Sequence, residues 1–208
     1  MLSCFPKLGG ASSATQLVMF GLAGAGKTTL LYRLKLDWKD ITNSMKGIKD
    51  DDPGYHYEEL SSSSSPLGTY GLWDVPGSQE MVPLWPMFYR YITVKGVLFV
   101  VDGSDDKAEK LTEVRRLLEK LLNEDELRMA AFVLIVNDKT DEDSGKSKEE
   151  MEEKVKSIED QLQVERFRKE YNCFHCVTLN CANTSENDRK WKEVLKIIKD
   201  NQVSLASK

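Results

Sequence analysis

An octet at residues 21–28, Gly-Leu-Ala-Gly-Ala-Gly-Lys-Thr, has the residue types and spacing best suited to chemistry. It matches G-x-x-x-x-G-K-T, in which backbone N–H groups of a glycine-rich loop surround phosphate oxygens. The Lys27 ammonium can reach the β- and γ-phosphates, and the Thr28 hydroxyl can ligate Mg²⁺. A strand-like run at 17–20 precedes the octet and a helix-like run at 29–34 follows it, so a helix N-terminus adds positive potential. We therefore predict a polyphosphate site rather than a glycine-rich turn that binds nothing. Its predicted contacts are Ala23, Gly24, Ala25, Gly26, Lys27, Thr28 and Thr29.

A second group of candidate ligand-binding residues lies at the end of the strand-like segment 69–74, where residues 73–77 read Trp-Asp-Val-Pro-Gly. The carboxylate of Asp74 can hold Mg²⁺ through water, and the amide of Gly77 can meet a γ-phosphate. Asp-x-Pro-Gly is also a common turn, so this motif indicates a phosphate site only in combination with the phosphate loop. We predict Thr28 and Asp74 as metal ligands.

A third set, Asn137-Asp138-Lys139-Thr140-Asp141, follows the strand-like segment 131–136. An aspartate carboxylate accepts two hydrogen bonds from the N1–H and exocyclic amine of guanine, a donor pair that adenine lacks. A lysine stem can lie over the base, and a backbone N–H from residues 180–183 can meet guanine O6. The alternative is a polar strand end with no ligand, which its place at the end of an α/β strand disfavours. The predicted contacts are Asn137, Asp138, Lys139, Asp141, Cys181 and Ala182.

Alternating apolar and amphipathic segments predict the elements that position these motifs. Strands are expected at 16–20, 55–60, 69–74, 96–101, 131–137 and 176–180, and helices at 27–36, 107–122, 148–164 and 188–201. The run at 96–101 is typical of a central parallel strand covered on both faces. We therefore predict an α/β P-loop NTPase fold, with a mostly parallel six-stranded sheet and helices on both faces. Loops are expected at 37–54 and 141–150, and the serine run 61–65 is expected to connect a hairpin.

Composition narrows the partners and the compartment. The net charge of −5 disfavours nucleic acid. No apolar stretch reaches the length of a membrane span, and Pro6, Gly9 and Gly10 interrupt any signal peptide. Four cysteines without a disulfide framework predict a reducing, cytoplasmic location. The C-x-x-C at 173–176 lacks the second pair that a zinc site needs, so we interpret these residues as ordinary thiols.

Together these motifs resemble the ADP-ribosylation factor and ADP-ribosylation-factor-like (Arf/Arl) branch of small GTPases over about residues 15–200. Trp73-Asp74-Val75-x-Gly77 followed by Pro83-Leu84-Trp85 is particular to this branch, and the segments at 100–102, 124–128 and 181–182 also fit. The resemblance implies a GTP/GDP switch with Mg²⁺ that works in membrane traffic through effectors, exchange factors and GTPase-activating proteins. It implies a GTPase domain at 15–201, between a flexible segment at 1–14 and a tail at 202–208.

Two departures from the family pattern fall in the switch regions. The family has a water-orienting Gln directly after the D-x-x-G glycine, whereas this chain has Ser78 there and Gln79 one position later. These two residues are the candidate catalytic groups. Asp52 stands where the family has a Mg²⁺-ligating Thr and is the third metal candidate, unless Thr42 substitutes.

The guanine motif is offset as well. The family's Asn-Lys-x-Asp fits residues 138–141 only with Asp138 in first place, whereas a one-residue slip puts Asn137 first and Thr140 at the aspartate position. We prefer the first alignment, because it keeps Asp141 as the guanine-reading residue.

These departures leave two functions open: a switch with slow hydrolysis, and a pseudo-GTPase that serves as an interaction subunit or scaffold. A P-loop kinase acting on ATP is disfavoured by the segments at 73–75 and 137–141. Peripheral contact with an organelle membrane is expected to be weak, because Leu2 excludes N-myristoylation and one acyl chain on Cys4 would hold poorly.

Overall fold

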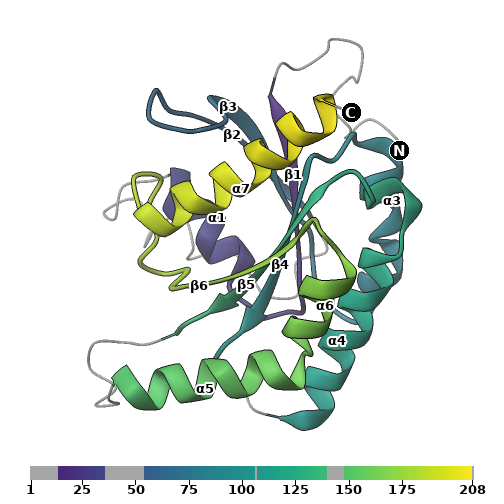
Figure 1. Ribbon diagram of the computed structural model, residues 1–208, viewed down its shortest axis with the longest axis vertical. Coiled ribbons are helices and arrows are strands. Elements are labelled where there is room, and N and C mark those ends of the chain that lie inside the picture. The colour runs from purple at the N-terminus through teal and green to yellow at the C-terminus, as the bar shows by residue number, and fades with distance from the viewer. Residues whose placement is uncertain (1–13, 36–53, 106, 140–147, 208) are drawn as a thin grey trace.

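The computed structural model describes residues 14–35, 54–105, 107–139 and 148–207. A six-stranded sheet with the strand order β2-β3-β1-β4-β5-β6 forms its centre (Figure 1). The strands are β1 (Thr15–Phe20), β2 (His56–Ser61), β3 (Thr69–Asp74), β4 (Gly96–Asp102), β5 (Ala131–Asn137) and β6 (Phe174–Leu179). Every neighbouring pair is parallel except β2 with β3, which form an antiparallel hairpin. The predicted mostly parallel sheet is therefore confirmed, with β2 as its antiparallel edge strand.

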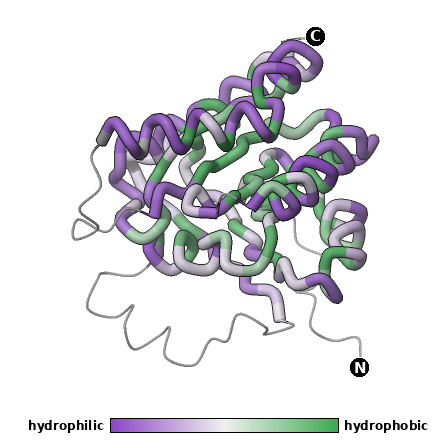
Figure 2. The backbone as a smooth tube through the Cα atoms, turned by 90° about the horizontal axis from the view of Figure 1, so that it is seen from below, coloured by the Kyte–Doolittle hydropathy of each residue, from purple (hydrophilic) through white to green (hydrophobic). Residues whose placement is uncertain are grey.

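Helices cover both faces of this sheet (Figure 1). They are α1 (Lys27–Lys35), α3 (Pro86–Tyr91), α4 (Ala108–Leu122), α5 (Lys148–Gln161), α6 (Val164–Glu170) and α7 (Arg189–Ala206), with 3₁₀ turns η2 (Val82–Leu84) and η3 (Asp125–Leu127). Leu17 and Met19 of β1 pack with α1 and α7, whereas Val18 and Phe20 pack on the α4 side. This division follows from the alternation of side chains along a strand. Figure 2 shows the result as hydrophobic strands enclosed by helices with hydrophilic outer residues.

Several boundaries differ from the pattern-based expectation. The helix expected at 148–164 is two helices, because Gln163 adopts a left-handed conformation with φ 60° between them. Residues 82–91 form η2 and α3, which the sequence pattern missed because two prolines and many aromatic residues hide the helical period. Helix α7 continues past residue 201 to Ala206, so residues 202–206 belong to it. None of the described helices combines the length and the apolar character that crossing a membrane requires.

The strand register brings the candidate residues to one end of the sheet. Met19 pairs with Asp74, and Asp102 pairs with Asn137. Because the carboxyl ends of parallel strands lie at one edge, the segments that follow β1, β3, β4 and β5 meet there. The serine-rich segment 62–68 connects β2 and β3 as the predicted hairpin turn.

Candidate nucleotide-binding site

A cavity of about 460 Å³ lies at this carboxyl edge of the sheet. The phosphate-loop octet, the end of β3, the end of β5 and the loop after β6 all contribute to its walls. Of the predicted site residues it gathers Ala23, Gly24, Gly26, Lys27, Thr28, Thr29, Asp74, Gly77, Asn137, Lys139, Cys181 and Ala182. Ala25, Ser78, Gln79 and Asp138 do not line it. Asp52 and Asp141 lie outside the described residues.

The phosphate loop folds tightly over the start of α1. Gly26 has φ 102°, a left-handed value that favours glycine, and a Cβ there would lie 2.4 Å from Asn137 Nδ2. A Cβ on Gly77 would lie 2.0 Å from Gly21 O, so the β3 end and the phosphate loop touch through their backbones. Helix α1 begins at Lys27, and its first-turn N–H groups have no partner within the helix. This cradle of N–H groups suits an anion.

The Lys27 ammonium is held at the centre of the loop. Its Nζ donates to Gly21 O at 2.8 Å and to Leu22 O at 3.1 Å, and the residue is only 6% exposed. A lysine ammonium has three N–H donors, and two of them are directed at these carbonyl groups. Because Lys27 also lines the cavity, its positive charge faces the space where a ligand would bind. The charge is thus in place for phosphate oxygens.

Thr28 and Asp74, two residues that the sequence predicts as Mg²⁺ ligands, are hydrogen-bonded to each other. Thr28 Oγ1 donates to Asp74 Oδ2 at 2.5 Å, and Asp74 is 3% exposed. A hydroxyl and a carboxylate in a phosphate-binding cavity are hard oxygen donors, which Mg²⁺ prefers. This donor set therefore fits the Mg²⁺ that accompanies a nucleoside polyphosphate, and such an ion would supply positive charge to the phosphates.

His56 also lines the cavity, and sequence reasoning missed it. It lies opposite Asp74 in the β2–β3 hairpin, and its Nδ1 is 3.6 Å from Asp74 Oδ2. Only the hairpin register places it there. That register can be worked out from the seven residues 62–68 between the two strands, once the ends of β2 and β3 are known.

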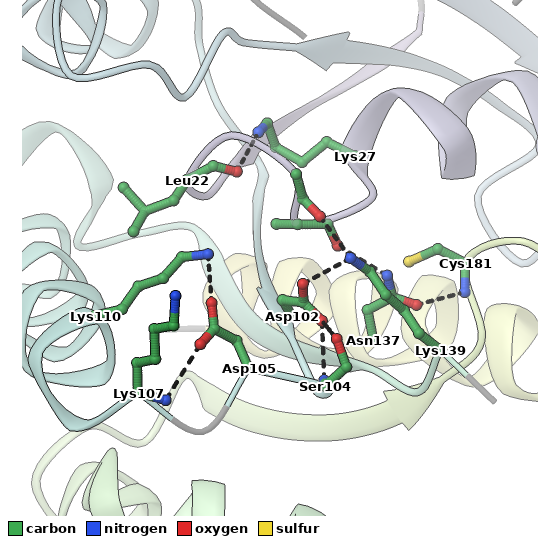
Figure 3. A network of polar contacts seen from close by, with 12 residues as sticks. Leu22, Lys27, Asp102, Ser104, Asp105, Lys107, Lys110, Asn137, Lys139 and Cys181 are labelled. Atoms are coloured by element: carbon green, nitrogen blue, oxygen red, sulfur yellow. Dashed lines mark hydrogen bonds and ion pairs between the residues drawn. The ribbon is translucent and has the colours of Figure 1, made fainter. Parts of the chain in front are cut away.

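Asn137 joins two walls of the cavity (Figure 3). Its Nδ2 donates to Ala25 O at 2.8 Å, and its Oδ1 accepts from the Cys181 N–H at 2.9 Å. The residue is 3% exposed. A buried side-chain amide with both ends satisfied holds the phosphate loop and the loop after β6 in a defined spacing.

Lys139 extends from the segment after β5 towards the same loop (Figure 3). Its Nζ donates to Gly24 O at 2.9 Å and to Asp102 Oδ2 at 2.6 Å. Burial by itself would raise the pKa of Asp102, but hydrogen bonds from Lys139 and from the N–H and hydroxyl of Ser104 lower it overall. Asp102 is therefore a charged anchor for Lys139.

The alignment that we preferred for the guanine motif stays a prediction, because Asp141 lies outside the described residues. The contacts nevertheless place Asn137, not Asp138, against the phosphate loop, with Lys139 beside it. The reason is strand alternation: Asn137 follows Val133 and Ile135 onto the α1 face, where the phosphate loop lies. Asp138 instead donates its backbone N–H to Leu179 O at 2.9 Å.

The two catalytic candidates lie beside the cavity rather than in it. The carbonyl of Ser78 accepts from the N–H groups of Met81 and Val82, which starts the turn into η2. Gln79 is exposed on that turn. In this structure neither side chain forms part of the cavity wall.

Three cysteines lie in the described part of the chain, of which Cys181 is buried and Cys173 and Cys176 are partly buried. Burial raises the pKa of Cys181 to about 12, and burial together with Glu159 raises the pKa of Cys176, whose Sγ donates to Glu159 Oε1 at 3.3 Å. Within the described ranges, no cluster of three or more His, Cys, Asp or Glu side chains is placed to hold a metal ion. Cys173 and Cys176 are free, and their interpretation as ordinary thiols stays a prediction.

A glycine-rich loop over a helix N-terminus, a buried lysine and a Thr–Asp pair define a P-loop protein of the small GTPase class. The family model for the ADP-ribosylation factor family matches residues 1–194, and the chain therefore belongs to that family. Members are GTP-binding switches that generally bind guanine nucleotide with Mg²⁺ and work with regulatory and effector proteins.

Proposed function

We propose that this chain is a guanine-nucleotide switch that binds GTP and GDP with Mg²⁺ and hydrolyses GTP slowly. The observation that carries the proposal is the convergence of Lys27, Thr28 and Asp74 in one cavity whose wall includes neither Ser78 nor Gln79. Phosphoryl transfer needs charge neutralisation and a positioned water. Lys27, Thr28 and Asp74 can provide the charge neutralisation, directly or through Mg²⁺. None of the described wall residues is a candidate for positioning the water.

Guanine selection rests on a second group of residues at the cavity. Lys139 is fixed over the phosphate loop by Gly24 and Asp102, and the Cys181 backbone is fixed by Asn137. A lysine stem and loop amides are suited to a flat base with a carbonyl oxygen. Asp141, two residues beyond Lys139, remains the proposed reader of the guanine N1–H and amine.

A second candidate is a pseudo-GTPase that holds one nucleotide state and acts as an interaction subunit. The exposure of Gln79, outside the cavity wall, favours it. A partner protein that supplies the water-orienting group would allow such a protein to hydrolyse GTP and act as the switch described above.

The cellular part of the proposal comes from the family alone. We propose a role in intracellular membrane traffic, through effectors, exchange factors and GTPase-activating proteins, in a cytoplasmic protein with weak peripheral contact to an organelle membrane.

Analysis of the co-purified nucleotide tests the biochemical part directly. The protein is heated, the released nucleotide is identified by ion-exchange chromatography, and single-turnover hydrolysis of loaded GTP is followed separately. GDP or GTP in the extract, with measurable turnover, supports the switch. Retained GTP without turnover favours the pseudo-GTPase. ATP or ADP in the extract, or a protein that takes up no added guanine nucleotide, overturns both.

A further inference from the structure

The imidazole of His56 lies beside the oxygen donors of Thr28 and Asp74. Its Nδ1 is 3.6 Å from Asp74 Oδ2, the same oxygen that accepts from the Thr28 hydroxyl at 2.5 Å. The three side chains come from β2, β3 and α1, and all three line the same cavity. Two hard oxygen donors and one nitrogen donor therefore meet at one wall.

The separation of these atoms is compatible with a shared cation. Divalent ions hold oxygen and imidazole nitrogen ligands at about 2.0–2.2 Å, which places ligand atoms about 3 Å apart when adjacent and about 4 Å apart when opposite. The 3.6 Å between His56 Nδ1 and Asp74 Oδ2 lies between these two separations, so a shift of the His56 ring by about 0.5 Å would bring both atoms onto one ion.

The ring of His56 is also oriented from its other side. Tyr32 on α1 meets it edge to face, with the ring centroids 6.0 Å apart and the planes at 63°. The side chain of His56 is 27% exposed, so a small ion can reach it.

We propose that His56 joins Thr28 and Asp74 as a nitrogen ligand of the divalent cation, and that the imidazole raises the affinity of this cavity for transition-metal ions relative to the same cavity without it. This proposal rests on the proposed function, because the cation arrives with the nucleotide. Imidazole suits first-row transition metals, whereas Mg²⁺ prefers an all-oxygen shell. The competing explanation is that His56 only pairs with Asp74 and never touches the cation.

Electron spin echo envelope modulation of Mn²⁺ bound with GDP tests ligation. The proposal expects a ¹⁴N coupling in the wild-type protein and its loss in His56→Asn, in which an amide oxygen replaces the imidazole nitrogen. The matched control is His175→Asn, because the chain has only two histidines and His175 lies on β6, at the opposite edge of the sheet from β2. This control should keep the coupling.

Dissociation constants of fluorescent GDP measured with Co²⁺ and with Mg²⁺ test selectivity in the same three proteins. The preference for Co²⁺ should fall by about tenfold or more in His56→Asn and stay unchanged in His175→Asn. Absence of ¹⁴N coupling in the wild type, with equal metal preference in all three proteins, overturns the role of His56 and leaves the switch intact. Failure of the wild type to bind GDP with either metal overturns the proposed function itself.

Discussion

Lys139 donates a 2.6 Å hydrogen bond to the carboxylate of Asp102, and this contact joins the segment after β5 to the end of β4. The same ammonium also donates to Gly24 O. Asp102 is thereby a positioning residue for the lysine stem, although it does not line the cavity itself.

Asp102→Asn should weaken GDP binding about fivefold. The change removes a charge-assisted hydrogen bond worth about 1 kcal/mol after allowance for the half-exposed Lys139 head group. Titration with fluorescent GDP measures the effect. Asp105→Asn is the control, because Asp105 pairs with Lys110 outside the cavity, and it should leave affinity unchanged. Equal losses in the two variants would contradict a specific role for Asp102.

Asp102 should also contribute to acid sensitivity. The pKa of Asp102 is lower in the folded protein than its ordinary value of 3.8. The ionised carboxylate therefore stabilises the fold at pH values above 3.8, and this stabilisation disappears as the pH falls from 3.8 through the lowered pKa. Urea unfolding at pH 6 and at pH 3 should therefore give a difference between wild type and Asp102→Asn that shrinks at the lower pH. A constant difference would mean that the carboxylate charge contributes nothing.

Asn137→Ala should lower the free energy of unfolding by about 2–6 kcal/mol. It leaves Ala25 O and the Cys181 N–H without their buried partner, and each such loss costs about 1–3 kcal/mol. Asn137→Asp keeps the acceptor for Cys181 but sets a buried carboxylate oxygen against Ala25 O, so it should cost at least as much. Urea denaturation provides the measurement, and Asn123→Ala is an exposed control expected to cost less than about 1 kcal/mol. Equal costs at positions 137 and 123 would refute the bridging role.

Lys27→Ala should abolish nucleotide binding, because the loop loses the buried ammonium group that Gly21 O and Leu22 O hold. Lys35→Ala is the matched control: it lies at the other end of the same helix and pairs with Glu58. Calorimetric titration with GDP compares the two. Unchanged affinity in Lys27→Ala would contradict the assignment of the phosphate loop.

Ser78→Gln should raise intrinsic GTP hydrolysis by about tenfold or more, since it places an amide directly after Gly77, where it can orient water. Gln79→Ala should leave the rate as it is, because Gln79 is exposed outside the cavity wall. Single-turnover assays with loaded GTP measure both rates. A slower Gln79→Ala would identify Gln79 as the water-orienting group after all.

Local patterns in the sequence were sufficient for the phosphate loop, the six strands and the mostly parallel sheet. Glycine spacing and hydrophobic period act between residues that are close along the chain, so Lys27 and Thr28 could be assigned without any coordinates. The sequence pattern did not predict the helix break at Gln163 or the helix at 86–91. These features depend on packing against the sheet rather than on a hydrophobic period.

Which side chains face the ligand depended on pairing between distant strands. His56 reaches Asp74 because β2 and β3 pair in one particular register, and a shift of one residue would turn it to the other face. In the same way, Asn137 rather than Asp138 meets the phosphate loop because of its parity along β5. A sequence motif states which groups are available, whereas the register of the folded sheet selects which of them point into the cavity.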